Sequence, residues 1–337
     1  TPIFPVSTAD GEYITDTSLI PKEGVWSFLR VAGNYMPYSY ANVFEKQGYS
    51  SNAYHNHTAT YYERDKYIET MGYNSYLAVG TGLEDRMDTS NWPNSDYEMV
   101  KTTVDDYINN EKFMAYYMTV SGHMNYTKIG NMMVYRNWDQ VKDLPYSNKA
   151  KGYLAANIEL DKAVGELLSR LEQAGKLEDT VIVISGDHYP YGLTLGEINE
   201  LSTFERDDKF EKFRMPFLIW SGSMKGPIKV EKIGSSLDVL PTVLNLFGAE
   251  FDSRLLMGRD ILSDSDPIVI FSDRSFITDK GRYNSLTEQF TPNEGVTVEE
   301  GYVDKINTII KEYDNDALLA GEGPLMKDLV EISDHDF

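Results

Sequence analysis

Short apolar runs alternate with amphipathic segments over most of the chain. Residues 180–185 are β-branched or apolar almost throughout, a pattern typical of a strand covered on both faces. Residues 148–175 carry apolar positions at spacings of three and four, which predicts a long helix ending at Gly175. A helix followed by a short loop and a buried strand is half of a βαβ unit, so the pattern predicts an α/β protein. Further strands are expected at 51–54, 112–120, 215–220 and 267–272, and further helices at 38–47, 58–71, 95–109 and 238–247.

The pattern changes after residue 273. Short strands and polar helices replace the long apolar runs, so we expect a main α/β domain over residues 1–273 and a small C-terminal α+β subdomain over residues 274–337. The subdomain is expected to hold strands at 275–277 and 282–286 and helices at 297–313 and 315–330. Residues 1–35 and 76–92 are expected to be irregular.

Side chains with metal-binding or acid–base chemistry follow three of the predicted strands. Asp187 and His188 come after 180–185, and His123 comes after 112–120. His55 and His57 follow the short strand at 51–54, so four of the five histidines sit just past a predicted strand. Open α/β sheets bind ligands outside the carboxyl ends of their strands. A lone histidine there is more often an ordinary loop residue, but the recurrence favours a site, and an Asp–His pair can hold a divalent cation.

Composition excludes several classes of protein. The 337 residues are 41% hydrophobic and 25% charged, as in ordinary globular proteins. The net charge of −22 argues against nucleic acid as a partner, and an anionic substrate would need a local positive site. The absence of cysteine excludes disulfides and thiolate metal sites. The chain has no membrane-length apolar run, no signal peptide and no initiator Met, so we expect a domain excised from a longer protein.

Several motifs occur in an order that resembles a known family. Together they resemble the extracellular catalytic domain of lipoteichoic acid synthases and related phosphoglycerol transferases, in the sulfatase-like branch of the alkaline phosphatase superfamily. The resemblance covers nearly the whole chain and implies a three-layer α/β/α sandwich with a mostly parallel central sheet. It rests on Ser-Thr-Ala-Asp-Gly-Glu at 7–12, Tyr-Tyr-Glu-Arg-Asp at 61–65, Ser-Gly-His at 121–123, Ser-Gly-Asp-His-Tyr-Pro at 185–190, and the segments 237–242 and 276–278.

The resemblance implies roles for the nucleophile and the metal ligands. Thr8 matches the family threonine that takes the phosphoglycerol group as a covalent intermediate, although from the sequence alone it would be a loop or helix-capping residue. Thr8, Asp187 and His188 match ligands of one divalent metal, for which the resemblance favours Mn²⁺. Mg²⁺ and Zn²⁺ also suit an oxygen and nitrogen donor set. A metal would activate the otherwise weak threonine nucleophile.

The resemblance also implies a pocket for the phosphoglycerol group. Arg64 matches the arginine that grips the phosphate, and His55 and His123 match histidines that line the pocket. His123 is expected to give a proton or hydrogen bond to a leaving or bridging oxygen. Tyr62 stands where the family often carries Trp.

One family ligand has no counterpart in the chain as given. The family's metal site also uses a Glu from the first strand of the sheet, well upstream of the nucleophile, whereas this chain begins seven residues before Thr8. We expect the strand and its Glu to have been removed, with Asp10 or Glu12 as alternative ligands. The chain as given is then expected to bind metal weakly or to be inactive.

The resemblance implies a phosphoglycerol transferase for lipoteichoic acid-type polymers. Its partners would be phosphatidylglycerol and a glycerol-phosphate polymer or glycolipid acceptor, and its parent protein would be anchored at the extracellular face of the bacterial cytoplasmic membrane. A sulfatase would need a Cys or Ser in a Cys/Ser-x-Pro-x-Arg signature, which is missing here, and phosphoethanolamine transferases usually carry disulfides. Two alternatives stay open: a metal-dependent phosphatase or phosphodiesterase of the same superfamily, and an inactive phosphoglycerol-binding domain.

Overall fold

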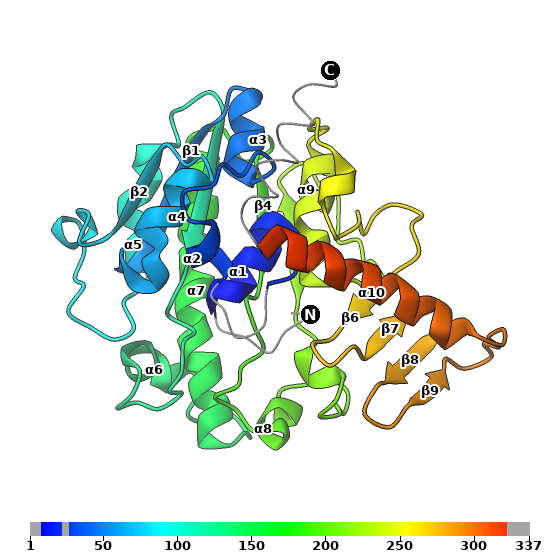
Figure 1. Ribbon diagram of the computed structural model, residues 1–337. Coiled ribbons are helices and arrows are strands. Elements are labelled where there is room, and N and C mark those ends of the chain that lie inside the picture. The colour runs from blue at the N-terminus through cyan, green and yellow to red at the C-terminus, as the bar shows by residue number, and fades with distance from the viewer. Residues whose placement is uncertain (1–7, 22–26, 322–337) are drawn as a thin grey trace.

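The structure is a computed structural model that describes residues 8–21 and 27–321. Figure 1 shows helices packed around a group of central strands, with a second sheet and a long C-terminal helix to one side. No helix in the described ranges is both long and apolar enough to cross a membrane.

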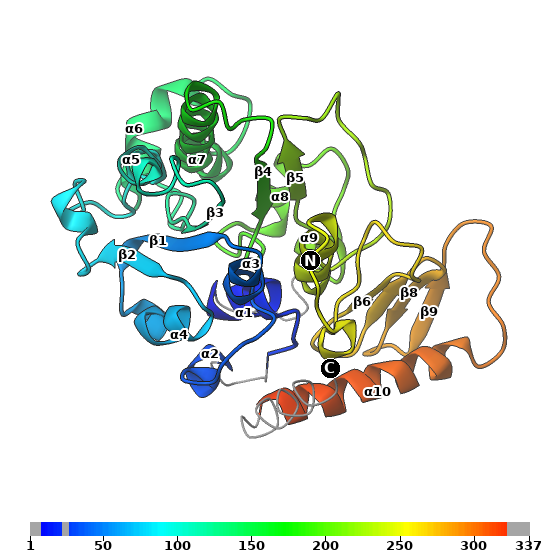
Figure 2. The ribbon, with the colours of Figure 1, turned by 90° about the horizontal axis from the view of Figure 1, so that it is seen from above.

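The central sheet is parallel and has the strand order β2–β1–β3. It is formed by β1 (Ser50–Thr58), β2 (Ser75–Val79) and β3 (Phe113–Met118). A separate antiparallel pair, β4 (Val181–Ser185) with β5 (Phe217–Ser221), lies beside β3 in Figure 2. The parallel strands bring their carboxyl ends to one edge, where ligand sites of α/β proteins form.

Helices cover both faces of these strands, as Figure 2 shows. On one face lie α5 (Asp96–Thr103), α6 (Met132–Asn137) and α7 (Asn148–Gln173), and on the other α1 (Thr8–Thr17), α3 (Tyr40–Lys46), α4 (Arg64–Thr70) and α9 (Val239–Leu246). Successive side chains of β4 point to opposite layers. Ile182 packs with the core that includes Leu171 of α7, and Val183 packs with the core that includes Leu240 of α9. The predicted three-layer α/β/α architecture is therefore confirmed.

The C-terminal region is a four-stranded antiparallel sheet crossed by one long helix. The sheet contains β6 (Ile268–Ile270), β7 (Phe276–Thr278), β8 (Gly281–Asn284) and β9 (Gln289–Pro292) in that order. The helix α10 runs from Tyr302 to Gly321, so the break expected near residue 314 is wrong; residues 322–330 of the second expected helix lie outside the described ranges. The domain boundary at residue 273 stays a prediction.

Other expectations need correction. The strand β1 continues through Thr58, so His55 and His57 lie inside it and not after it, and the helix expected at 58–71 is confined to α4 with a 3₁₀ turn before it. The segment expected to be irregular at 76–92 contains most of β2. The strand β4 is half-buried and ends in the exposed Ser185, so it is covered less fully than its apolar run predicts, and it pairs with the antiparallel β5. Shorter elements are α2 (Ser27–Val31), α8 (Leu195–Glu200) and 3₁₀ helices at Tyr61–Glu63, Leu83–Asp85, Val104–Asp106, Trp138–Gln140, Glu211–Phe213, Ser236–Asp238 and Ser253–Leu255.

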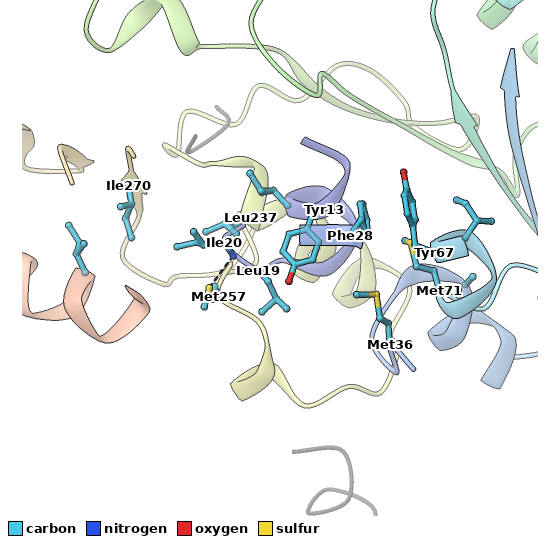
Figure 3. Close-up of a cluster of buried hydrophobic side chains, with 14 of the residues drawn as sticks. Tyr13, Leu19, Ile20, Phe28, Met36, Tyr67, Met71, Leu237, Met257 and Ile270 are labelled. Carbon is cyan, nitrogen blue, oxygen red and sulfur yellow. Dashed lines mark hydrogen bonds between the residues drawn. The ribbon is translucent and has the colours of Figure 1, made fainter. Parts of the chain in front are cut away.

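A continuous apolar core fixes α1 in the molecule (Figure 3). The ring of Tyr13 meets Phe28 edge-on at 5.2 Å, and Phe28 stacks on Tyr67 of α4 at 4.0 Å. Just after α1, the backbone N–H of Ile20 donates to the sulfur of Met257 at 3.3 Å. Because this core joins α1 to α2, α4 and the C-terminal half of the chain, it holds the first residues of α1 in a fixed place.

Candidate active site

Thr8 and the Asp187–His188 pair meet at the start of α1. Thr8 is the first residue of the helix, and its Oγ1 lies 3.5 Å from Nε2 of His188, a residue 180 positions away in the chain. The Oδ2 atom of Asp187 lies 3.2 Å from the same Nε2. Gly11 permits this approach, because a Cβ on Gly11 would lie 2.3 Å from the backbone oxygen of Asp187. The structure therefore brings together the three residues expected to hold a metal.

The orientation of the His188 ring suits a cation at this point. Its Nδ1 lies 2.9 Å from the carbonyl oxygen of Tyr189, which can only accept, so Nδ1 is a donating nitrogen. The other ring nitrogen, Nε2, faces the Asp187 carboxylate and the Thr8 hydroxyl. A histidine that donates one ring N–H to a carbonyl and turns the other nitrogen to oxygen ligands is the usual arrangement of a metal-binding imidazole.

The donor set fits a divalent cation but supplies few ligands. Asp187 and His188 are two ligands and the Thr8 hydroxyl a third; within residues 8–21 and 27–321, no group of three His, Cys, Asp or Glu side chains is arranged to hold a metal. Glu12 is unavailable because both of its oxygens accept hydrogen bonds from other side chains. Asp10 is buried, its Oδ1 has no partner in the described part of the chain, and burial raises its pKa to about 6.

Arg64 is held by Glu12 in a fully buried ion pair. Its Nε donates to Glu12 Oε1 at 3.1 Å and its Nη2 donates to Oε2, while the hydroxyls of Tyr67 and Tyr116 donate to the same carboxylate at 3.2 and 3.1 Å. Burial alone would lower the pKa of Arg64, but Glu12 raises it above its ordinary value. One edge of Arg64, which is expected to grip the phosphate, is thus bound to Glu12 of α1, four residues after Thr8.

The remaining donor of Arg64 faces His55. Nη1 lies 3.4 Å from His55 Nε2 and 3.2 Å from the carbonyl oxygen of Tyr61. His55 Nδ1 lies 2.9 Å from the carbonyl oxygen of Met118, so Nε2 is the accepting nitrogen. Burial and the charge of Arg64 lower the pKa of His55 to about 3, which keeps the ring neutral. The Tyr62 ring lies 5.4 Å from the guanidinium carbon, so Arg64, His55 and Tyr62 form one group.

His123 lies in an aromatic cluster next to this group. Its ring is 5.2 Å from Trp92, whose ring is 5.0 Å from His57, and His57 is 5.9 Å from His55. Trp92 was not expected in the site, and His57 was expected at this sheet edge but without an assigned role. Their neighbourhood could not be found from the sequence, because the loop carrying Trp92 meets the end of β1 only in the folded chain. Burial, Arg64 and His123 lower the pKa of His57.

A buried carboxylate fixes the loop that carries His123. Asp96 Oδ1 accepts from the backbone N–H of Val120 at 2.9 Å and from the side chain of Asn56 at 2.8 Å. Its two oxygens also accept from the N–H of Ser121, each at 3.2 Å. Burial raises the pKa of Asp96 to about 6. Because Asn56 lies in β1, Asp96 ties the loop after β3 to the strand that carries His55 and His57.

Comparisons with known proteins bear on this site. The family model described as Sulfatase matches residues 36–249. A lipoteichoic acid synthase from Staphylococcus saprophyticus is 26% identical over 288 residues, which are 82% of this chain and 43% of that protein. A solved lipoteichoic acid synthase, LtaP from Listeria monocytogenes, superposes with a TM-score of 0.72 at 23% identity, over 98% of this chain and 82% of that one. A protein of the alkaline phosphatase superfamily from Vibrio parahaemolyticus superposes with a TM-score of 0.64 at 16% identity, over 94% and 78%.

These matches confirm the expected alkaline phosphatase-like fold. The chain spans less than half the length of the curated relatives that it matches, at 43% to 46% of each.

Proposed function

The chain belongs to the sulfatase family, and from this premise we propose that it is the catalytic part of a metal-dependent phosphoglycerol transferase. The proposed donor is phosphatidylglycerol, and the proposed acceptor is a glycerol-phosphate polymer or a glycolipid. The names of the curated relatives and of LtaP support this substrate class. The parent protein is proposed to be membrane-anchored, with this domain at the extracellular face of the bacterial cytoplasmic membrane.

The observation that carries the proposal is the convergence at Thr8. A half-buried hydroxyl starts a ten-residue helix and lies 3.5 Å from a histidine whose free nitrogen also faces Asp187. The amino end of a helix favours negative charge, so a phosphoryl group transferred to Thr8 would sit in a favourable field. A structural threonine would not need to meet an Asp–His pair about 180 positions away in the chain.

Thr8, Asp187 and His188 are the residues that would hold a divalent cation, with Mn²⁺ the proposed metal, and the cation would acidify the hydroxyl and neutralise phosphate charge. In the first step, the Thr8 hydroxyl releases its proton to solvent and its oxygen forms a bond to the phosphorus of the lipid head group. The bond from phosphorus to the diacylglycerol oxygen breaks, and that oxygen takes up a proton. Thr8 is left carrying the phosphoglycerol group.

In the second step, a glycerol hydroxyl of the acceptor attacks the phosphothreonine and restores Thr8. His123 is proposed to exchange the proton with the attacking or leaving oxygen, because its Nδ1 lies 2.6 Å from the carbonyl oxygen of Met124 and leaves Nε2 free. Arg64 is proposed to contact the phosphate through Nη1, which Glu12 does not bind and which would exchange its contacts with His55 Nε2 and the Tyr61 carbonyl oxygen for the phosphate. His55 and Tyr62 are proposed to line the glycerol side of the pocket.

The test is turnover of a phosphatidylglycerol head group in the presence of Mn²⁺ by wild type and by Thr8→Ala. The variant should lose at least about a thousandfold in rate, because the nucleophile is removed. Thr102→Ala is the control, since the Thr102 hydroxyl bonds only to the backbone of its own helix, and it should keep full activity. Substantial turnover by Thr8→Ala would refute the assignment. Transfer to water alone would favour a phosphodiesterase, and binding without turnover an inactive binding domain.

A further inference from the structure

An exposed apolar and basic surface adjoins the candidate site. We call it the α6 surface: the exposed side chains on the loop before α6, on α6 itself and on the segment that leads into α7. Ile129 is fully exposed, Tyr135 is 64% exposed and Leu144 is 38% exposed. In Figure 1 α6 and the start of α7 lie at the lower edge of the molecule, near α8. The surface comprises the exposed Lys128, Ile129, Tyr135, Arg136, Lys142, Leu144 and Lys149 and the half-buried Trp138 and Lys151, and the exposed Asp139 and Asp143 lie among them.

The α6 surface is continuous with the rim of the site. Asn131, which caps α6, donates from its side chain to the carbonyl oxygen of His123 at 2.8 Å. The next residue, Met132, donates its backbone N–H to the carbonyl oxygen of Trp92 at 2.9 Å. Trp92 is 43% exposed and its ring lies 5.2 Å from His123. Asn131 and Met132 therefore join the α6 surface directly to the residues at the rim of the site.

The charge of this region is opposite to that of the whole chain. Residues 124–151 contain five Lys or Arg and two Asp, a net charge of +3 in a chain of −22. The ammonium groups of Lys128 and Lys151 lie 5.0 and 6.0 Å from the centre of the Trp138 ring. The net charge of +3 already counts Asp139, which pairs with Lys142. Two acids from outside this range, Glu98, which pairs with Arg136, and Glu200, which accepts from the backbone of Ser147, reduce it to +1.

The combination of apolar and basic side chains indicates which kind of partner the α6 surface binds. Lysines next to exposed aliphatic and aromatic residues are typical of protein surfaces that rest on anionic bilayers, where Trp and Tyr lie at the headgroup level and Lys is attracted to lipid charge. A soluble polyanion would explain the lysines but not the full exposure of Ile129.

We propose that the α6 surface docks on an anionic lipid bilayer and holds the candidate site at the level of the lipid head groups. This inference deepens the proposed function and rests on it, because the proposed lipid substrate is the reason for the site to face the bilayer. Docking itself needs neither Thr8 nor a metal, so the two ideas can fail separately.

The experiment measures sedimentation of the chain with vesicles of phosphatidylglycerol and phosphatidylcholine, without added metal. Ile129→Asp should bind these vesicles about fivefold or more weakly than wild type, because it removes an apolar contact and adds a negative charge. Ile228→Asp is the control, since Ile228 is 78% exposed but lies outside the α6 surface, and it should bind as wild type does. Lys128→Glu should weaken binding to the anionic vesicles only.

Three results would overturn the proposal. Wild type could fail to bind the anionic vesicles, or Ile129→Asp and Ile228→Asp could bind them equally. Alternatively, a soluble glycerol-phosphate oligomer could displace wild type while Ile129→Asp has no effect, which would make the surface a polyanion site. Thr8→Ala should bind vesicles normally, so loss of turnover and loss of docking remain distinguishable. Circular dichroism of each variant checks that these exposed substitutions leave the fold intact.

Discussion

At the scale of single residues, the contact that matters most for the site is the ion pair by which Glu12 holds Arg64 in place. Its carboxylate is buried together with Arg64 and accepts from that guanidinium and from two tyrosine hydroxyls. A buried charge is tolerated only when it is paired and hydrogen-bonded, so neither partner can be removed without leaving the other unpaired. Glu12 therefore fixes the position of Arg64 relative to Thr8, one helical turn earlier.

Glu12→Ala should lower the free energy of unfolding by about 3–5 kcal/mol, the usual cost of leaving a buried charge unpaired. Urea denaturation at neutral pH measures this loss. The control is Glu98→Ala, which breaks the partly exposed pair with Arg136 and should cost less than about 1 kcal/mol. Equal effects of the two variants would show that Arg64 does not depend on Glu12.

His55 should make folding stability depend on pH. The unfolded chain takes up a proton at the ordinary pKa of 6.5, whereas the folded chain resists protonation down to about 3. The stability that neutral His55 contributes is complete above about pH 6.5 and is lost as the pH falls toward 3. Between about pH 7.5 and pH 5 this loss is about 2 kcal/mol.

His55→Gln should remove that part of the pH dependence. Urea denaturation of wild type and variant at the two pH values measures it, and the difference in stability between the two proteins should shrink at the lower pH. A difference that stays constant with pH would mean that His55 is not held neutral in the folded protein.

At the scale of elements, α1 organises the candidate site. Thr8 opens the helix, Gly11 packs against the backbone of Asp187, and Glu12 binds Arg64. The opposite face places Tyr13 in the apolar core. One helix thus sets the distances between Thr8, the Asp187–His188 pair and Arg64.

Gly11→Ala should move Thr8 and Glu12 of α1 away from the Asp187–His188 pair. The added Cβ would lie 2.3 Å from Asp187 O, a backbone atom that cannot turn away, so α1 or the loop after β4 must shift. We expect a destabilisation of about 1–3 kcal/mol together with a large loss of turnover. The matched control is Gly165→Ala in α7, where nothing lies within 4 Å of the new Cβ, and it should stabilise the protein by about 0.5–1 kcal/mol. Full activity of Gly11→Ala would contradict the role given to α1.

The sequence predicted the elements whose patterns are regular. The helix α7 and the strands β3, β4 and β5 were found within a few residues, because their apolar periodicity is strong. The helix α1 was missed because Gly11 and three threonines give it a weak helical pattern, and its buried face includes Asp10 and Glu12, whose burial depends on tertiary contacts. The strand β2 was missed because it is short and borders Gly80.

The candidate site was predictable in part. The Asp187–His188 pair could be placed at a strand end from the local pattern, and its meeting with Thr8 followed from the family resemblance. The Glu12–Arg64 pair and the ring contacts of His57 with Trp92 join segments far apart in the chain, and no local pattern encodes them. The roles of the site residues stay predictions until they are measured.

At the scale of the whole molecule, metal binding should couple to stability. A cation held by α1 and the loop after β4 binds only the folded chain, so Mn²⁺ at about a hundred times its dissociation constant should add about 2.7 kcal/mol. Thermal unfolding with and without Mn²⁺ measures the shift. Asp187→Asn should lose most of it, whereas Asp161→Asn, an exposed change on α7, should keep it. The same shift in both variants would place the metal elsewhere.

The most direct measurement of the central claim is peptide mass spectrometry of the protein after brief incubation with phosphatidylglycerol and Mn²⁺. We predict a phosphoglycerol group on Thr8 itself, which disappears when acceptor is added. In Thr8→Ser the group should be found on the serine, unless serine cannot replace threonine as the nucleophile. Turnover accompanied by a modified residue other than Thr8, or by no covalent adduct at any stage, would contradict the account.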